Sequence, residues 1–206
     1  MLSDRLLEIG FAFHGHRCPA MPLGVRAGLA AMEALDVERS KDKELHCICE
    51  TGSAHATMCF VDGVQVATGC TYGKANIERV EHCKNAITLT DVATGRAVRV
   101  AVRADFLKKA LQSEFVELRA RGVPPQDVAP EVVEPLIERV WNAPTDSLFT
   151  IGPVRKIEFR RTKGTFDWHI CENCGEIVFE HGVRLVGGRK VCLGCVERTR
   201  RNGVGR

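Results

Sequence analysis

Two pairs of cysteines in the last third of the chain have the spacing of a metal site. Cys171 and Cys174 enclose two residues, and so do Cys192 and Cys195. This spacing lets one tight turn direct both sulfur atoms at a single ion, and four thiolates form a closed tetrahedral shell around zinc. The surrounding segment buries too little apolar surface to fold unaided, so a metal ion would supply folding free energy. We therefore predict a structural zinc finger over residues 165–206.

Histidines and arginines surround this finger. His169 or His181 could replace a cysteine ligand, but four cysteines suffice, so we expect both histidines at the surface. The tail carries only basic charges, from Arg198, Arg200, Arg201 and Arg206. Such a tail is usually solvated, and contact with nucleic acid is the weaker expectation.

A second group of metal-type side chains lies in the first third of the chain. His14, His16 and Cys18 alternate through one predicted turn, and Cys59 and Cys70 follow. Cys18 precedes a predicted helix, whose dipole would lower the pKa of its thiol and favour the thiolate. Imidazole and thiolate suit zinc and other soft transition metals, but free cysteines are also common as small buried hydrophobes. Spacing alone leaves both interpretations open.

The composition indicates a folded protein whose cysteines remain reduced. Of its 206 residues, 45% are hydrophobic and 27% are charged, and the net charge of +3 is too small to indicate nucleic-acid binding by itself. The ten cysteines, with no apolar leader sequence before them, favour metal binding over disulfides. No apolar run reaches the length of a membrane span, about 18 residues. We expect a cytoplasmic protein with no membrane contact.

Hydrophobic periodicity and turn residues predict the elements that position these donors. The first expected helix ends at Gly15. The others run from Pro22 to Leu35, over Ala54–Thr68, from Asp105 to Arg121 and over Glu131–Trp141. The expected strands are Glu44–Glu50, Cys83–Thr90, Ala97–Arg103 and Leu148–Arg160. Residues 1–160 then form a first domain, and a polar, basic linker joins it to the finger.

Four segments resemble the FmdE-like family of formylmethanofuran dehydrogenase subunits. They are Gly15–Pro19, Leu23–Arg26, Cys59–Gln65 and Thr68–Asn76. The resemblance implies an α+β core, with an antiparallel or mixed sheet and packed helices, that is usually paired into a homodimer. Gly63-Val64 replaces the usual Ala-Ile, which is a change in packing.

The same resemblance implies a cleft in which the motif residues meet. The resemblance implies a metal or reactive centre surrounded by His16, Cys18, Cys59 and Cys70, with His14 as an additional candidate. The metal there would be zinc or another soft transition metal. The resemblance also places Asp62, Gln65, Thr71 and Lys74 along the cleft, and the catalytic candidates are Cys18, Gln65 and Lys74. His55, one helical turn before Cys59, could add a ligand. The finger resembles the DksA/TraR type, which implies a treble clef.

These residues leave several functions open. One is a metal-dependent enzyme or accessory protein, linked to a molybdenum or tungsten enzyme of the formylmethanofuran dehydrogenase type. The alternative is a regulatory or metal-sensing module whose finger contacts protein or nucleic acid. A purely structural role for both sites is disfavoured, because a core of this size needs no second ion for stability.

Overall fold

In the computed structural model the chain divides into two compact units, Met1–Phe159 and Arg160–Arg206. The structure describes residues 2–54, 57–159 and 164–203. His55 and most of the expected linker lie outside these ranges. None of the described helices is both long and apolar enough to cross a membrane.

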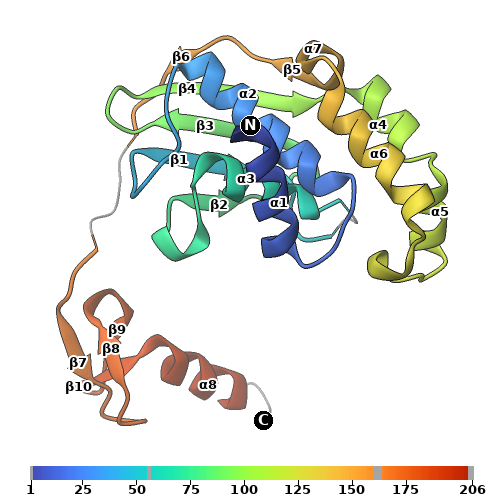
Figure 1. The fold of residues 1–206 in the computed structure, drawn as a ribbon. Coiled ribbons are helices and arrows are strands. Elements are labelled where there is room, and N and C mark those ends of the chain that lie inside the picture. The colour runs from blue at the N-terminus through green and yellow to red at the C-terminus, as the bar shows by residue number, and fades with distance from the viewer. Residues whose placement is uncertain (1, 55–56, 160–163, 204–206) are drawn as a thin grey trace. The chain divides into compact units, whose positions relative to one another are not determined.

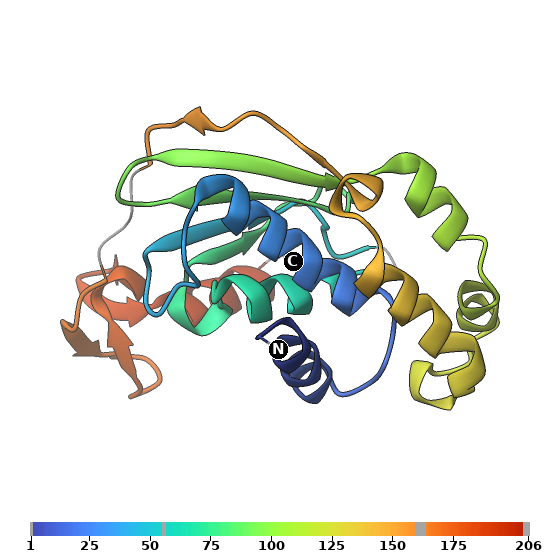
Figure 2. The same cartoon turned by 45° about the horizontal axis from the view of Figure 1, so that its top comes forward.

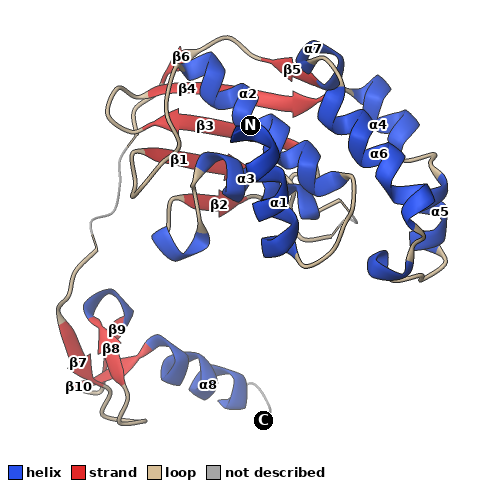
Figure 3. Cartoon of the chain, viewed as in Figure 1, coloured by secondary structure: helices blue, strands red, loops and turns tan. Residues whose placement is uncertain are grey.

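The first unit is an α+β fold built on one mixed sheet (Figures 1 and 3). Its strands are β1 Leu45–Cys49, β2 Ile77–Arg79, β3 Ala86–Asp91, β4 Arg96–Val102, β5 Phe149–Ile151 and β6 Arg155–Lys156. Their order is β2-β1-β3-β4-β5, and β6 also pairs with β4. Only β1 and β2 run parallel; the other pairs are antiparallel.

The helices of this unit are α1 Leu2–His14, α2 Ala20–Leu35, α3 Cys59–Thr68, α4 Ala104–Ala110, α5 Glu114–Ala120, α6 Pro130–Asn142 and α7 Thr145–Leu148. Helix α2 packs on β3 and β4, α3 lies against α2, and α1 contacts both (Figure 2). Alternating strand residues face these helices because side chains on a strand point to opposite faces in turn. The register aligns Cys47 with Leu89 and Cys49 with Ile87, and all four are buried in one apolar core.

The crossing of α2 and α3 is unusually close because glycines line it. A Cβ atom on Gly24 would lie 1.9 Å from the carbonyl oxygen of Phe60, and one on Gly63 would lie 2.0 Å from that of Met21. Gly63 therefore permits an approach that an alanine would obstruct. The N-terminal ends of the two helices consequently lie side by side.

Three expected elements differ from the structure. The helix expected from Asp105 to Arg121 is interrupted between α4 and α5, where the hydroxyl of Ser113 donates to the carbonyl of Ala110 and competes with the helical hydrogen bonds. The strand expected over Leu148–Arg160 is split into β5 and β6 around Pro153, which has no N–H for the ladder. Helix α3 begins only at Cys59.

The second unit consists of short elements around four cysteines. They are β7 Trp168–Ile170, β8 Ile177–Phe179, β9 Val183–Val186, β10 Arg189–Cys192 and α8 Leu193–Gly203. Strand β7 pairs with β8, and β9 with β10, both antiparallel. The buried residues of its core cluster are Cys171, Val191 and Cys195, which is a small core for a folded unit.

We predict that Gly24→Ala lowers the free energy of unfolding by about 2 kcal/mol or more, because the added methyl group meets backbone that cannot move aside. Urea unfolding followed by circular dichroism measures the change. Gly73→Ala is the matched control, because a Cβ there meets no atom within 4 Å. Equal stability of the two variants would contradict the close crossing.

Candidate metal centres

Four donor atoms from two segments converge at the N-terminal ends of α2 and α3. One nitrogen each from His14 and His16 and the sulfur atoms of Cys18 and Cys59 lie within 4.8 Å of one another. The Nε2 atom of His14 is 3.0 Å from that of His16 and 3.6 Å from the Cys18 sulfur. Ligands of a tetrahedral zinc ion lie roughly 3.3–3.8 Å apart, given bonds of about 2.0–2.3 Å. The donor set therefore fits one ion of this kind.

The loop that carries three of these donors is held from outside the site. Gly15 has a positive φ of 87°, and its N–H donates to the carbonyl of Phe11, which ends α1 and turns the chain. Arg17 then stacks on the Phe11 ring at 4.2 Å and forms a bidentate ion pair with Glu134 of α6. These two interactions of Arg17 position His14 and His16, which lie in the chain before Cys18 and the start of α2.

Asp62 orients one of the histidines. It lies one helical turn after Cys59 on α3, and its carboxylate is 2.7 Å from Nδ1 of His14. This bond leaves Nε2 of His14 directed at the other donors, which is the usual carboxylate–histidine–metal arrangement. Asp62 raises the pKa of His14 to about 9, with a further contribution from Cys59.

The hydrogen bond between Cys18 and Cys59 shifts the pKa values of the two thiols in opposite directions. The hydrogen bond from Cys18, with a further contribution from His14, lowers the pKa of Cys59 to about 4. The same bond, together with burial, raises the pKa of Cys18 well above its usual range. The Ala20 and Met21 amides do favour the Cys18 thiolate, as the helix dipole predicts, but they are outweighed. The structure thus places the thiolate on Cys59.

His16 is the neutral member of the set. Burial lowers its pKa, and the positive charge of His14 lowers it further. Its ring lies tilted against that of His14, with the two ring centres 4.1 Å apart. An uncharged imidazole is the form that binds a metal.

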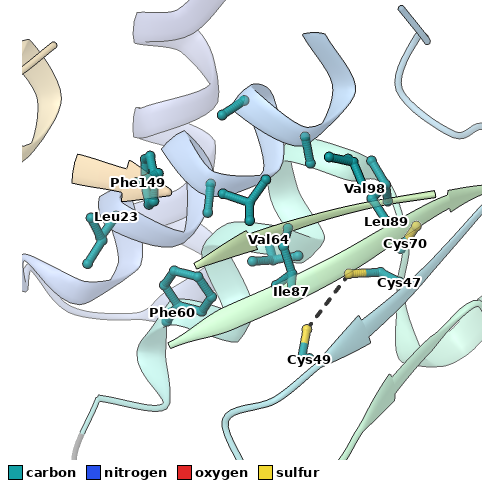
Figure 4. Close-up of a cluster of buried hydrophobic side chains, with 14 of the residues drawn as sticks. Leu23, Cys47, Cys49, Phe60, Val64, Cys70, Ile87, Leu89, Val98 and Phe149 are labelled. Carbon is teal, nitrogen blue, oxygen red and sulfur yellow. Dashed lines mark hydrogen bonds between the residues drawn. The ribbon is translucent and has the colours of Figure 1, made fainter. Parts of the chain in front are cut away.

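Cys70, expected among these donors, lies elsewhere. Cys59 begins α3 and Cys70 follows its end, so the helix separates them by about 15 Å at 1.5 Å per residue. Cys70 is fully buried in the apolar core near Cys47 and Cys49, whose sulfur atoms are 3.9 Å apart (Figure 4). Burial raises its pKa to about 11. Its place in the donor set is taken by His14.

The other expected cleft residues divide into two groups. Gln65 lies beside Asp62, to which its amide donates at 3.3 Å. Lys74 instead donates to the backbone carbonyls of Ser40 and Lys41, and the N–H of Thr71 donates to Asn76. Lys74 and Thr71 therefore hold a loop rather than line the donor set.

Two cavities border the core donors. The first, of about 310 Å³, is lined by His14, Cys59, Asp62 and Gln65 among others. The second, of about 270 Å³, touches His16, Cys18 and Cys59 and continues along α4 and α5. Cys59 faces both. The apolar residues of α4 and α5 carry no sequence signal of a site, because their pattern is that of any amphipathic helix.

The second unit brings together the other four predicted ligands. The sulfur atoms of Cys171, Cys174, Cys192 and Cys195 lie within 4.8 Å of one another. Cys171 and Cys174 enclose a turn between β7 and β8, Cys192 ends β10, and Cys195 lies in the first turn of α8. Neither His169 nor His181 belongs to this set.

Hydrogen bonds in this cluster favour the thiolate at Cys171 and Cys195, whereas the pKa of Cys174 is raised. The Cys192 N–H donates to the Cys171 sulfur at 3.2 Å, and this bond is the main reason that the pKa of Cys171 falls to about 6. The Arg198 guanidinium donates to Cys195 at 3.1 Å, so this arginine of the tail is engaged within the unit. The side chains of Arg200 and Arg201, and Arg206 as a whole, lie outside the described part.

Comparison with known proteins now identifies the first unit. The sequence model of a family described as "FmdE, Molybdenum formylmethanofuran dehydrogenase operon" matches residues 13–150. The chain belongs to the FmdE family. This match includes all four core donors and the residues of both cavities that lie next to them. It ends before the second unit.

Two individual proteins resemble this FmdE-family chain. A "Probable S-adenosyl-L-methionine-binding protein" of Archaeoglobus fulgidus is 33% identical over 201 residues, which is 93% of this chain and 52% of that protein. The chain thus spans about half the length of that curated relative. The crystal structure of a "tungsten formylmethanofuran dehydrogenase subunit e (fmde)-like protein" from Syntrophus aciditrophicus superposes with a TM-score of 0.58 at 20% identity, covering 96% of this chain and 93% of that one. It shows the same fold.

We predict that the protein binds two metal ions per chain, one in each unit. Cys59→Ser and Cys171→Ser should each lose one ion, because each removes a ligand from a different set. Cys70→Ser is the control and should keep both. Elemental analysis of protein purified without oxygen measures the content, and loss of an ion from Cys70→Ser would contradict the replacement of Cys70 by His14.

Metal binding at the core centre should release about two protons per ion at pH 7, one from His14 and one from Cys18, since Cys59 is already ionised and His16 neutral. The apparent association constant should therefore rise steeply with pH up to the pKa of His14, about 9, and less steeply above it, where only Cys18 still releases a proton. Calorimetry in buffers of different ionisation enthalpy counts these protons. Asp62→Asn should reduce the count towards one, and an unchanged count would refute the role of Asp62.

Proposed function

We propose that the core domain binds zinc or another soft transition metal through His14, His16, Cys18 and Cys59, and that this ion serves a metal-dependent enzyme or accessory protein. The observation that supports this most is the position of the donors between two cavities. An ion that only stabilised the fold would be enclosed, and the apolar core of this unit is large enough without one.

A metal ion held here by four protein ligands would polarise a carbonyl group or activate a water molecule by accepting a fifth ligand from one of the cavities. The chain's own residues would prepare the site. Asp62 holds His14 in its binding orientation, and Gln65 presents a polar side chain to the first cavity. Of the three expected catalytic residues, Cys18 becomes a ligand, Gln65 remains beside the site, and Lys74 is bound to a loop.

The second unit is proposed to be a zinc finger of the treble-clef type. A turn with two cysteines, two β-hairpins and a helix that carries the last cysteine support this assignment. Four thiolates leave no position for a substrate, so this ion would be structural. The finger would then be available to bind a partner.

The proposed localisation, oligomeric state and partner are based on membership of the family. We propose a cytoplasmic homodimer that acts with a protein partner in a molybdenum or tungsten enzyme system related to formylmethanofuran dehydrogenase. The alternative is a regulatory or metal-sensing module whose finger contacts protein or nucleic acid. An accessible core metal favours the first, and a closed core metal favours the second.

Cobalt substitution separates these two functions. Co²⁺-loaded wild type carries both centres, while Co²⁺-loaded Cys59→Ser carries only the finger, so the difference spectrum belongs to the core. We expect azide or cyanide to change this difference spectrum, because the donors border open cavities, and the finger spectrum to stay constant. S-adenosyl-L-methionine, the ligand in the name of the A. fulgidus relative, is a further probe. A core spectrum that no added ligand changes would overturn the proposed reactive centre.

A further inference from the structure

The second cavity has the properties of a ligand pocket. Its volume of about 270 Å³ lies just below the range typical of drug-sized ligands, which suggests a smaller molecule. One end is formed by His16, Cys18 and Cys59, and the walls are formed by apolar residues of α4 and α5 such as Leu107 and Phe115. Phe115 is 8% exposed, so it is a firm wall rather than a mobile side chain.

The break between α4 and α5 shapes this wall. A continuous helix would be straight, whereas the interruption at Ser113 lets Ala110 of α4 and Phe115 of α5 line the same space. Pro19 and Leu23, from the start of α2, complete the apolar lining on the side of the metal donors. The pocket therefore runs from the core centre into an apolar chamber.

The polar groups of this pocket are suited to an anion. Arg119 of α5 lines it, and among the described lining residues there is no Asp or Glu, while the acidic thiol of Cys59 belongs to the end formed by the metal donors. The Arg119 guanidinium donates one bond, to the carbonyl of Val123, and carries five N–H donors in all. The Asn85 oxygen accepts from the Thr57 hydroxyl at 2.8 Å, and its amide nitrogen donates one N–H to the Thr57 carbonyl at 3.4 Å. The second N–H of this amide is what remains for a ligand.

We propose that this cavity binds a small apolar carboxylate, such as a short-chain or aromatic acid, with its carboxylate on Arg119 and its apolar part against Leu107 and Phe115. A single guanidinium matches one carboxylate in a bidentate pair, and the predominantly apolar walls match the hydrocarbon part of such an acid. This inference rests on the proposed function, because it names the substrate class for the same core centre.

Calorimetric titration of the zinc-loaded full chain with sodium hexanoate tests the proposal. Hexanoate should bind more tightly than hexan-1-ol, and hexylamine more weakly than both. Arg119→Gln should weaken hexanoate binding about tenfold or more, because a charged hydrogen bond is lost, and Arg119→Lys should recover part of it. Arg121→Gln, two residues further on and absent from the described lining of the pocket, is the matched control and should bind as the wild type does.

Ala110→Trp should abolish hexanoate binding by filling the chamber; if this variant does not fold, the comparison of Arg119→Gln with Arg121→Gln decides. Zinc content is measured on the same samples. Two zinc ions per chain without Arg119-dependent binding of hexanoate would overturn this inference alone. Arg119-dependent binding by protein that holds no core zinc would overturn the proposed function alone.

Discussion

The close crossing of α2 and α3 is the constraint on which the core centre depends. Gly24 and Gly63 bring the two helix backbones so near that no side-chain atom fits between them. Because the N-terminal ends of both helices then lie together, Cys18 before α2 meets Cys59 at the start of α3. Two helix dipoles point their positive ends at this place, which suits two thiolates.

Charge in the core centre is balanced through specific partners. Cys59 carries a negative charge, which the hydrogen bond donated by Cys18 stabilises. Protonated His14 lies between this thiolate and the Asp62 carboxylate. The centre is therefore organised before any ion binds. The bidentate pair of Arg17 and Glu134 reinforces this order from the surface.

The two cysteine-containing centres differ in what surrounds them. The second unit has almost no apolar core of its own, so an ion held by its four cysteines would supply folding free energy. The core centre belongs to a unit with a large apolar interior and borders two cavities. The first arrangement is that of a structural ion, and the second is that of an ion accessible to small molecules.

The sequence by itself determined the donor set of the finger, since the spacing of Cys171, Cys174, Cys192 and Cys195 expresses local turn geometry. It also indicated the α+β class and most helices and strands, because periodicity reports which face of an element is buried. The sequence did not predict the interruption between α4 and α5. The apolar pattern continues past Ser113, and only a side-chain hydrogen bond marks the break.

Tertiary structure alone decided which residues of the core motifs meet. The length of α3 separates Cys70 from Cys59, and the turn at Gly15 adds His14 to the set. The meeting of Cys18 with Cys59 is not encoded in residue spacing, because these two donors are more than 40 residues apart. The pocket that Arg119 and Phe115 line depends likewise on how α4 and α5 pack beside α2, which no local pattern specifies.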